Sequence, residues 1–476
     1  MERIRFSLAG GLSAHQMEVA HEAVLRILSE IGLECDHDRT TAAVTGDGIE
    51  FKQGRLRFSR EVVNSTIEQL REVGRKRTPP DRLRITAPWT CYNVVDMESG
   101  EVRGSTAADL KEMLKLVASV YTSGPPPVCP CDLDPRLQIL WAEKTCLEMA
   151  PGFGGGIVTL DPDTIHWIGE LHAVAGRHYD LALQAVISPL RLDRLALELF
   201  WHFKDDPVVR ASINTSPIPV GGISAPMLPS GLLVQGVAEQ LGGIIVSKRL
   251  GCAGPDTVLH QTEIDCGDMR YLTTAHSLPD TLMVALLQQD LVQYFSGYRP
   301  ANMCLCTNAK LADGFAASDR MAYLLMLGLA GFRSFSFGAG QLSMDEIFSP
   351  AQFIIDQEIG RYVQHILDGA KWQTDAEGTL RCIAEGVEEG NFLSQAGTLD
   401  ALPELFDSPI LRRDNVNQWR AAGAVSVEQL ALDRAKAAIA SFVPASDAVP
   451  HGKLDPVFEQ ACRALGLDTA ARSVPR

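Results

Sequence analysis

Four short segments of this 476-residue chain carry residue types that could bind or transform a small molecule. Gly221 and Gly222 would let backbone amides approach a ligand closely, while neighbouring prolines stiffen the loop. Ser224 adds a hydroxyl group, and Asp268 offers a carboxylate that could hold a cation. The four segments read SPIPVGGISAP (216–226), DCGDMR (265–270), TNAKLAD (307–313) and GAGQ (338–341).

The third and fourth segments supply further polar groups and glycines. Asn308 brings an amide and Lys310 an ammonium group, while Gly338, Gly340 and Gln341 follow a short aromatic run. Taken singly, each of the four segments is also typical of an ordinary turn. Taken together, they predict a ring of groups around one mouth.

Several cofactor signatures are incomplete. The GxG of the fourth segment is followed by Leu342-Ser343-Met344, which does not complete a dinucleotide fingerprint. The pairs Cys129/Cys131 and Cys304/Cys306 are spaced by two residues, so on a strand both thiols face one side, unlike a zinc knuckle. No H-E-x-x-H is present in the sequence. We predict neither nicotinamide nor a metal ion, and interpret these cysteines as packed thiols.

Bulk composition narrows the class of protein. A formal net charge of −16 disfavours nucleic acid as a partner, and no apolar run reaches the length of a membrane span or a signal peptide. Eleven scattered cysteines do not form a secreted disulfide framework. We therefore expect a cytoplasmic protein with free thiols.

The rhythm of helices and strands predicts how these loops are positioned. From residue 106, helical segments alternate with short apolar runs, which is typical of βα units. Seven runs are predicted as strands, one short of a closed barrel: 127–131, 153–160, 181–187, 209–215, 252–259, 301–306 and 332–337. We predict a TIM (β/α)8 barrel at 106–400, an N-terminal α+β extension at 1–105 and a C-terminal helical extension at 401–476. In such a barrel, loops after the strands form the active site.

Helix boundaries can be predicted at both ends of the chain. Ser13 and Gln16 form a capping-box pattern at the start of a helix, and Gly32 supplies its left-handed stop. Further helices are predicted at 136–149, 232–246, 282–295, 315–329, 354–367 and 427–440.

Seven segments, in order along nearly the whole chain, also match a known pattern. They are 12–32, 91–101, 221–226, 268–270, 308–310 with Asp313, 338–340 with Asp356 and Glu358, and 406–423. In order and spacing they resemble the trimethylamine methyltransferase family. This chain contains only standard residues, so it resembles the branch without pyrrolysine, where glycine betaine and related quaternary amines are the known kind of substrate.

The resemblance implies an enzyme that moves a methyl group from a methylated, quaternary amine to the Co(I) centre of a corrinoid (cobalamin) presented by a separate corrinoid protein, with no tightly bound cofactor. It implies Asp268, Asn308 and Lys310 as catalytic residues. We expect the substrate to meet the loop residues Gly221, Gly222, Ser224, Gly338, Gly340 and Gln341 and the aromatic rings of Tyr92, Phe335 and Phe337, because aromatic faces suit a quaternary ammonium. We also expect a homo-oligomer.

The chain departs from the family at polar positions. It reads GNFLSQAGT at 390–398, where family members tend to carry two histidines, and TNAK at 307–310 in place of S-D-x-K. Two alternatives therefore stay open: a barrel enzyme that uses a tertiary amine or another methyl donor, and a non-catalytic binder of quaternary amines.

Overall fold

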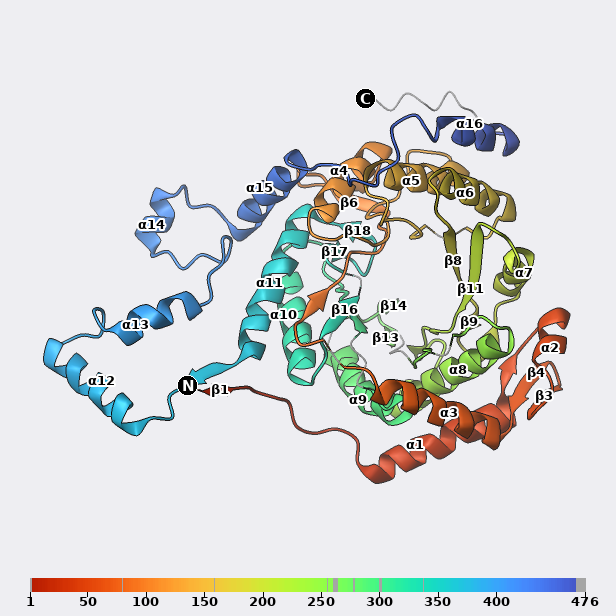
Figure 1. Cartoon of the computed structure of the whole chain (residues 1–476), viewed down its shortest axis with the longest axis horizontal. Coiled ribbons are helices and arrows are strands. Elements are labelled where there is room, and N and C mark those ends of the chain that lie inside the picture. Colours follow the sequence, from red (N-terminus) through yellow and green to blue (C-terminus); the bar gives the residue numbers. More distant parts are fainter. Residues whose placement is uncertain are drawn as a thin grey trace.

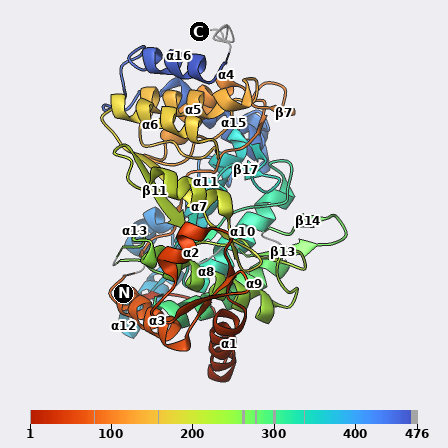
Figure 2. The ribbon, with the colours of Figure 1, turned by 90° about the vertical axis from the view of Figure 1, so that its right-hand side faces the viewer.

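Helices and strands alternate along most of the chain. The structure is a computed structural model that describes residues 2–78, 80–157, 159–254, 256–259, 264–276, 279–298, 302–336 and 338–467. Figures 1 and 2 show the ribbon from two perpendicular directions.

The N-terminal part combines helices with short strands, as predicted. Its elements are β1 (Glu2–Ile4), α1 (Ala14–Arg26), the π-helix η1 (Ile27–Ile31), β2 (Leu33–Glu34), α2 (Asp38–Val44), β3 (Ile49–Lys52), β4 (Arg55–Phe58) and α3 (Arg60–Arg75). Ser13 and Gln16 form the predicted capping box at the start of α1. Gly32 ends the following π-turn with a φ of 72°, a conformation that glycine adopts without strain.

The central part repeats strands and helices. Its elements are β5 (Arg84–Ile85), β6 (Asn93–Val95), β7 (Val102–Gly104), α4 (Ala107–Ala118), α5 (Pro135–Met149), α6 (Pro162–Val174), β8 (Tyr179–Gln184), β9 (Val186–Ile187), β10 (Arg191–Leu192), α7 (Arg194–Phe203), β11 (Val209–Asn214), β12 (Val220–Gly221), α8 (Pro229–Arg249), β13 (Asp265–Asp268), β14 (Thr273–Thr274), α9 (Pro279–Ser296), β15 (Asn302–Cys304), α10 (Gly314–Leu329), β16 (Ser334–Ser336), β17 (Gln341–Leu342), β18 (Ile347–Phe348) and α11 (Pro350–Asp368).

Parallel pairing dominates the interior of this part. Helices α4 to α11 form a ring around the strands (Figure 1). Within the ring, β8 pairs with β11, β12 with β13, β16 with both β15 and β5, and β6 with β18, each pair in parallel. Across the described residues these ladders form separate short sheets and not one closed sheet. The fold is therefore mixed α/β, with strands inside and helices outside.

Four of the seven predicted strands coincide with observed strands: β8 overlaps 181–187 and β9 lies in it, β11 lies in 209–215, β15 in 301–306 and β16 in 332–337. The runs 127–131 and 153–160 contribute only single bridges among their described residues, Cys91 to Val128 and Gly124 to Phe153. The strand predicted at 252–259 is wrong, because its described residues form no strand and β13 begins only at Asp265. Val258 and Leu259 are buried all the same, since apolar character indicates burial and not pairing.

Two strands before residue 106 pair with strands late in the chain. Arg84 and Ile85 of β5 lie opposite Ser334 and Phe335 of β16. Strand β6 likewise pairs with β18, bringing Asn93 opposite Ile347. The segment 84–104 is thus part of the central strand system.

The last part is helical, with β19 (Ala370–Trp372) pairing with β1 at its start. Its helices are α12 (Ala376–Glu389), α13 (Ala396–Ala401), η2 (Leu402–Glu404), α14 (Val416–Ala421), α15 (Val427–Ala440) and α16 (Asp455–Ala464). Helix α15 has the predicted bounds and packs against α11 and α4, while α16 packs on α6 and α5. Helices α12, α13 and α14 stand off from the ring (Figure 1).

Close helix packing at Gly74 generates a test of the fold. A β-carbon at Gly74 of α3 would lie 1.9 Å from the carbonyl oxygen of Ser296 at the end of α9. We expect Gly74→Ala to lower the free energy of unfolding by about 1–3 kcal/mol, because the helices must separate. Chemical denaturation measures the change. Gly104→Ala is the matched control, since its β-carbon would meet nothing within 4 Å; equal stability of the two variants would contradict the packing described.

Candidate functional site

The four loop segments predicted from the sequence lie next to one another. Strand β12 pairs with β13, which sets Gly221 opposite Cys266. The Nδ2 atom of Asn308 donates to the carbonyl oxygen of Thr274 at 2.9 Å, joining the third segment to the β13–β14 hairpin. The amide of Met344 donates to the carbonyl oxygen of Thr307 at 2.7 Å, joining the third segment to the residues that follow the fourth. The structure therefore brings all four segments to one region.

The loop after β12 holds its shape through backbone contacts. Gly222 has a φ of 82°, and its amide donates to the carbonyl oxygen of Ala225 at 2.8 Å. Ser224 Oγ accepts a hydrogen bond from the amide of Val220 at 3.0 Å. Gly222 is exposed and Gly221 is buried. The predicted contact residue Ser224 thus shapes the turn, and exposed Gly222 offers the surface.

The loop after β16 is built by close packing. A β-carbon at Gly338 would lie 1.6 Å from the carbonyl oxygen of Leu305, and one at Gly340 would lie 2.8 Å from Cβ of Phe353. Gln341 is fully buried, and its Oε1 accepts from the amides of Gly338 and Trp89. The chain already covers the surfaces of these three loop residues, so they have a packing role here, and their contact with substrate stays a prediction.

A buried ion pair fixes this same loop from beneath. Arg320 of α10 and Asp356 of α11 are fully buried, with Nε and Oδ1 3.4 Å apart. Arg320 Nη2 donates to the carbonyl oxygens of Gly338 and Gln341, and Asp356 Oδ2 accepts from the amide of Gly340 at 2.7 Å. Burial raises the pKa of Asp356, and the nearby guanidinium opposes that rise. Hydrogen bonds with both members of this ion pair hold the Gly338–Gln341 loop in one conformation.

Asp268 is paired and not open to a ligand cation. Its carboxylate accepts from Arg270 Nε at 3.0 Å and Nη2 at 2.7 Å, and the amide of Arg270 donates to it as well. These hydrogen bonds lower the pKa of Asp268. The ion pair with Arg270 argues against a catalytic or cation-holding role for Asp268, and that role stays a prediction.

The third segment keeps one unpaired polar atom. Asn308 Oδ1 is buried and has no hydrogen-bond partner within the described ranges. Lys310 is exposed, and its Nζ donates to the carbonyl oxygen of Asn308 at 2.6 Å. Asp313 caps α10 by accepting from the amides of Phe315 and Ala316. Of this segment, Asn308 is the residue with capacity left for a ligand.

The predicted aromatic contacts separate into different environments. Tyr92 is 56 % exposed beside β6, so its ring is available. Phe335 is fully buried in a hydrophobic cluster with residues of α10 and α11, which favours a packing role, and its contact with substrate stays a prediction. On β16 successive side chains face opposite sides, and Phe335 faces the outer helices. Phe337 lies outside the described residues.

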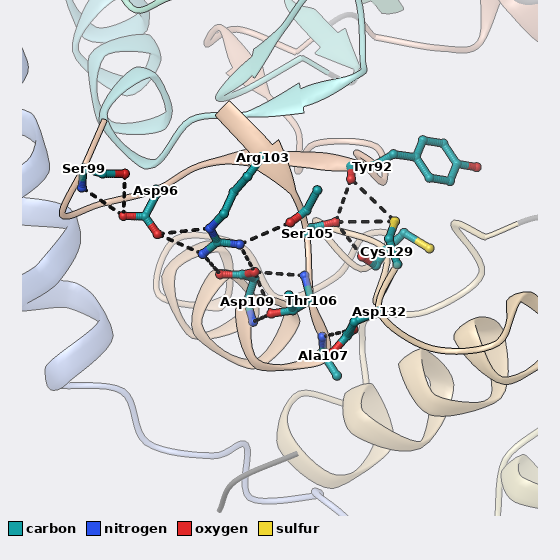
Figure 3. Close-up of polar contacts among 12 residues, drawn as sticks. Tyr92, Asp96, Ser99, Arg103, Ser105, Thr106, Ala107, Asp109, Cys129 and Asp132 are labelled. Atoms are coloured by element: carbon teal, nitrogen blue, oxygen red, sulfur yellow. Dashed lines mark hydrogen bonds and ion pairs between the residues drawn. The ribbon is translucent and has the colours of Figure 1, made fainter. Parts of the chain in front are cut away.

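The residues before α4 form a polar cluster that is structural (Figure 3). Arg103 bridges Asp96 and Asp109, with Nη2 to Asp96 Oδ2 at 2.9 Å and Nη1 to Asp109 Oδ2 at 2.7 Å. Asp96 also accepts from the amides of Glu98 and Ser99, and these contacts hold its pKa well below the usual range. This cluster explains the 91–101 segment: it ties the β6–β7 hairpin to the start of α4.

Sequence reasoning missed a buried pair next to Gly221. Asp265, the first residue of β13, lies 3.1 Å from Nδ1 of His276, and both are nearly inaccessible. Cys266 packs against the hydrophobic core, so by strand alternation Asp265 faces the opposite side. Burial, assisted by Arg320, lowers the pKa of His276 to about 4. In the sequence, the acidic residue Asp265 at the start of a short strand is the one signal that could have indicated this pair.

Exposed apolar side chains lie on the loop that contains Gly222 and on the neighbouring β13–β14 hairpin. The set, named here the apolar collar, is 46–83 % exposed and comprises Ile223, Met227, Leu228, Met269, Tyr271 and Leu272. A β-carbon at Gly222 would meet the methyl groups of Met227 and Met269, and one at Gly267 would meet Met269 and Ile223, which places these side chains together. The collar belongs to the loop after β12 and the β13–β14 hairpin, which projects from the ring in Figure 2. An apolar surface of this kind marks an interaction site.

Cys129 and Cys131, which the sequence analysis interprets as packed thiols, lie close to polar groups of the chain. Cys129 Sγ lies 3.2 Å from Gln138 Oε1, and Cys131 Sγ lies 3.5 Å from the carbonyl oxygen of Tyr92. In the described ranges, no group of three His, Cys, Asp or Glu side chains is arranged to hold a metal ion. Among the same residues, no helix has the length and apolar character that crossing a membrane requires.

Comparison with known proteins gives a consistent family. The model of the trimethylamine methyltransferase family matches residues 5–455. A trimethylamine methyltransferase of Desulfitobacterium hafniense is 22 % identical over 92 % of this chain and 91 % of its own. A glycine betaine methyltransferase of the same species, strain Y51, is 22 % identical over 96 % and 98 %. The solved monomethylamine methyltransferase of Methanosarcina barkeri is 12 % identical, covers 94 % of this chain and 86 % of its own, and has a TM-score of 0.40.

The lowered pKa of His276 predicts how stability depends on pH. Its pKa is about 4 in the folded chain against 6.5 for the ordinary side chain, so the folded state binds fewer protons between these values. This contribution to stability is complete above pH 6.5 and is lost as the pH falls toward 4. Between pH 7 and 4.5 we expect the wild type to lose about 2 kcal/mol more stability than His276→Gln. Denaturant unfolding at both pH values measures this; equal losses would show that His276 is protonated in the fold.

Proposed function

Because the chain belongs to the trimethylamine methyltransferase family, we propose that it transfers a methyl group from a methylated amine to the cobalt of a corrinoid carried by a partner protein. Its relatives act on trimethylamine and glycine betaine by name, and we propose a quaternary amine as the donor. We also propose that the enzyme works in the cytoplasm and without a tightly bound cofactor of its own.

We propose a (β/α)8 barrel as the scaffold. The ring of helices, the parallel pairs inside it and the position of the loops after the strands all favour this fold. Since β5 pairs with β16, we place the start of the barrel near residue 84 and not at 106, and its end at α11. Residues before 84 form the N-terminal extension, and residues after 369 form the C-terminal one.

The apolar collar is the observation that carries the proposal. It lies on the loop after β12 and on the β13–β14 hairpin, with Met227 and Met269 next to Gly222. The same hairpin accepts the hydrogen bond from Asn308 and contains Asp265 of the pair with His276. Leaving six large apolar side chains in water is unfavourable, at roughly 25 cal/mol for each Å² that a partner could cover. A partner protein docked on the collar would exclude water from the reacting groups. A small-molecule enzyme without a protein partner has no need of such a rim.

This reaction needs a site that positions the methylated amine and does not have to activate it. The corrinoid supplies the nucleophile for the methyl carbon when its carrier protein is docked. The C–N bond breaks, its electron pair stays on nitrogen, and a quaternary donor leaves as a neutral amine without any proton transfer. The residues of this chain therefore need to hold the cation, exclude water and aim one methyl group.

Asn308 is the residue we propose for holding the cation. Its buried Oδ1 has no partner within the described part of the chain, and a carbonyl oxygen presents negative partial charge to an ammonium group. Tyr92, with its exposed ring, is a candidate for cation–π contact, worth about 0.5–2 kcal/mol depending on desolvation. Lys310 carries the wrong charge for this task, and Asp268 is already paired.

A tertiary amine is the second candidate, favoured by the Asp265–His276 pair. A tertiary amine is protonated near neutral pH, and its proton must stay on nitrogen during transfer so that a neutral secondary amine leaves when the C–N bond breaks. The neutral imidazole of His276, oriented by Asp265, could accept a hydrogen bond from this N–H group and hold the ammonium in place. With a quaternary donor, the rate of methyl transfer would show no ionisation from the substrate. With a tertiary donor, the rate would fall as the pH rises and the amine loses its proton, and it would depend on His276.

Methylation of Co(I) cobalamin tests the proposed reaction. We expect at least one quaternary amine, screened beside tertiary amines, to methylate free Co(I) cobalamin, followed by its absorption spectrum. No nicotinamide or added metal ion should be needed. Tight binding of betaines with no methyl transfer would point to a non-catalytic binder and contradict the proposal.

Substitution of Asn308 tests the substrate contact. Asn308→Ala removes the free carbonyl oxygen, and we expect kcat/KM for the amine to fall about tenfold, which corresponds to about 1.4 kcal/mol. Lys310→Met is the control, because that exposed side chain contacts only a backbone oxygen. A loss of activity in Lys310→Met with none in Asn308→Ala would reverse the assignment.

A further inference from the structure

Two cysteines close to Tyr92 differ in their access to solvent. Cys129 is fully buried, and its Sγ donates to Oε1 of Gln138 on α5 at 3.2 Å. Cys131 is exposed, and its Sγ lies 3.5 Å from the carbonyl oxygen of Tyr92 and 3.8 Å from Oγ of Ser105. Figure 3 shows Tyr92, Ser105 and Cys129 together at the start of α4. An oxidant in solution therefore reaches one thiol of the pair before the other.

A tight turn brings the two cysteines together. The amide of Cys131 donates to the carbonyl oxygen of Cys129 at 2.9 Å, which closes a γ-turn with Pro130 at its centre. In an extended strand, Cα atoms two residues apart are about 6.6 Å from each other, near the upper end of the ~4.4–6.8 Å that a disulfide spans. The turn shortens this separation. Burial raises the pKa of the Cys129 thiol most, and the charge and hydrogen bond of Cys131 raise it further, so the two thiols are in contact.

A second pair of cysteines with the same spacing provides a comparison. Cys304 is half-buried in β15, where it lies opposite Ser336 of β16. Cys306 follows this extended strand and is buried. The second pair therefore has neither the exposed thiol of Cys131 nor its tight turn, and we expect it to stay reduced where the first pair is oxidised.

We infer that Cys129 and Cys131 form a redox-sensitive modification site, which a hydroperoxide converts from two thiols to a disulfide. The sulfur of Cys131 attacks one oxygen of hydrogen peroxide, the O–O bond breaks, and the other oxygen takes the thiol proton and leaves as water. The sulfur of Cys129 then displaces the hydroxyl group of the Cys131 sulfenic acid, which leaves as a second water with the proton of Cys129. Two thiols and one peroxide thus give one disulfide and two waters, and an added dithiol reverses the change by thiol–disulfide exchange.

The position of the pair links the disulfide to the candidate site. Ser105 Oγ lies 3.0 Å from the carbonyl oxygen of Tyr92 and 2.5 Å from that of Cys129, and the amide of Ser105 donates to Tyr92 at 3.1 Å. When Cys131 Sγ bonds to Cys129, it leaves the carbonyl group of Tyr92, and the contacts of Ser105 transmit the change to that backbone. The disulfide itself is independent of methyl transfer, whereas its effect on amine binding rests on the proposed function through the ring of Tyr92.

Peptide mass measures the disulfide directly. After stoichiometric hydrogen peroxide, and alkylation of the remaining thiols in denaturant, we expect most of the tryptic peptide 116–136 to be unalkylated and lighter by two hydrogen atoms. Peptide 271–310, which holds the second pair, should be fully alkylated. Dithiothreitol should reverse the change, Cys131→Ser should abolish it, and Cys382→Ser, which removes another exposed thiol, should leave it unchanged. Full alkylation of peptide 116–136, or an equal yield of disulfide in both peptides, overturns the inference.

Hydrogen exchange and calorimetry measure the effect of oxidation on the site. In the oxidised chain we expect the amides of residues 91–105 to exchange at least threefold faster than in the reduced chain, with no change in peroxide-treated Cys131→Ser. The Kd for glycine betaine should rise at least fivefold on oxidation. Unchanged exchange and unchanged affinity would overturn the effect at Tyr92. If the disulfide forms but the reduced chain binds no betaine, the result contradicts the proposed function and not the disulfide.

Discussion

The buried ion pair between Arg320 and Asp356 is the constraint on which the candidate site depends. Both side chains are fully buried, and together they hold both ends of the Gly338–Gln341 loop. Removing one partner would leave a buried charge uncompensated, which costs about 3–5 kcal/mol. Because that loop also carries the Gln341 contact to Trp89, the same pair links α10 and α11 to the segment preceding β6. The pair thus joins α10 and α11 to the Gly338–Gln341 loop and to the segment before β6.

Many polar residues that stand at the loops build those loops and do not reach outward. Their side-chain oxygens accept hydrogen bonds from nearby backbone amides or from an arginine, as at Gln341, Ser224, Asp268 and Asp313. This is expected where strands end, since every freed amide and carbonyl must find a partner. Among the described residues of these loops, capacity for a ligand remains at Asn308 Oδ1, which is buried and has no hydrogen-bond partner there. The capacity of such a loop to bind a ligand therefore depends on its unpaired polar atoms and not on its number of polar residues.

Apolar side chains in water mark a surface that the single chain leaves incomplete. The apolar collar lies on the loop after β12 and on the β13–β14 hairpin, beside the candidate site. It joins methionines and a tyrosine next to a glycine loop. Methionine side chains are flexible and polarisable, and such side chains adapt readily to a binding partner.

The sequence alone determined the family, the approximate positions of the helices and three of the four loop segments that follow strands, whereas the segment 265–270 is mostly strand β13 itself. These follow from local rules: the capping box at Ser13 and Gln16 and the period of α15 act within a few residues. Tertiary structure decided which of those loop residues are free. The Arg270 contact of Asp268, the burial of Phe335 and the pairing of β5 with β16 depend on where distant or facing groups lie. The sequence shows whether a residue is polar or apolar, but the groups that it contacts are fixed only when the chain folds.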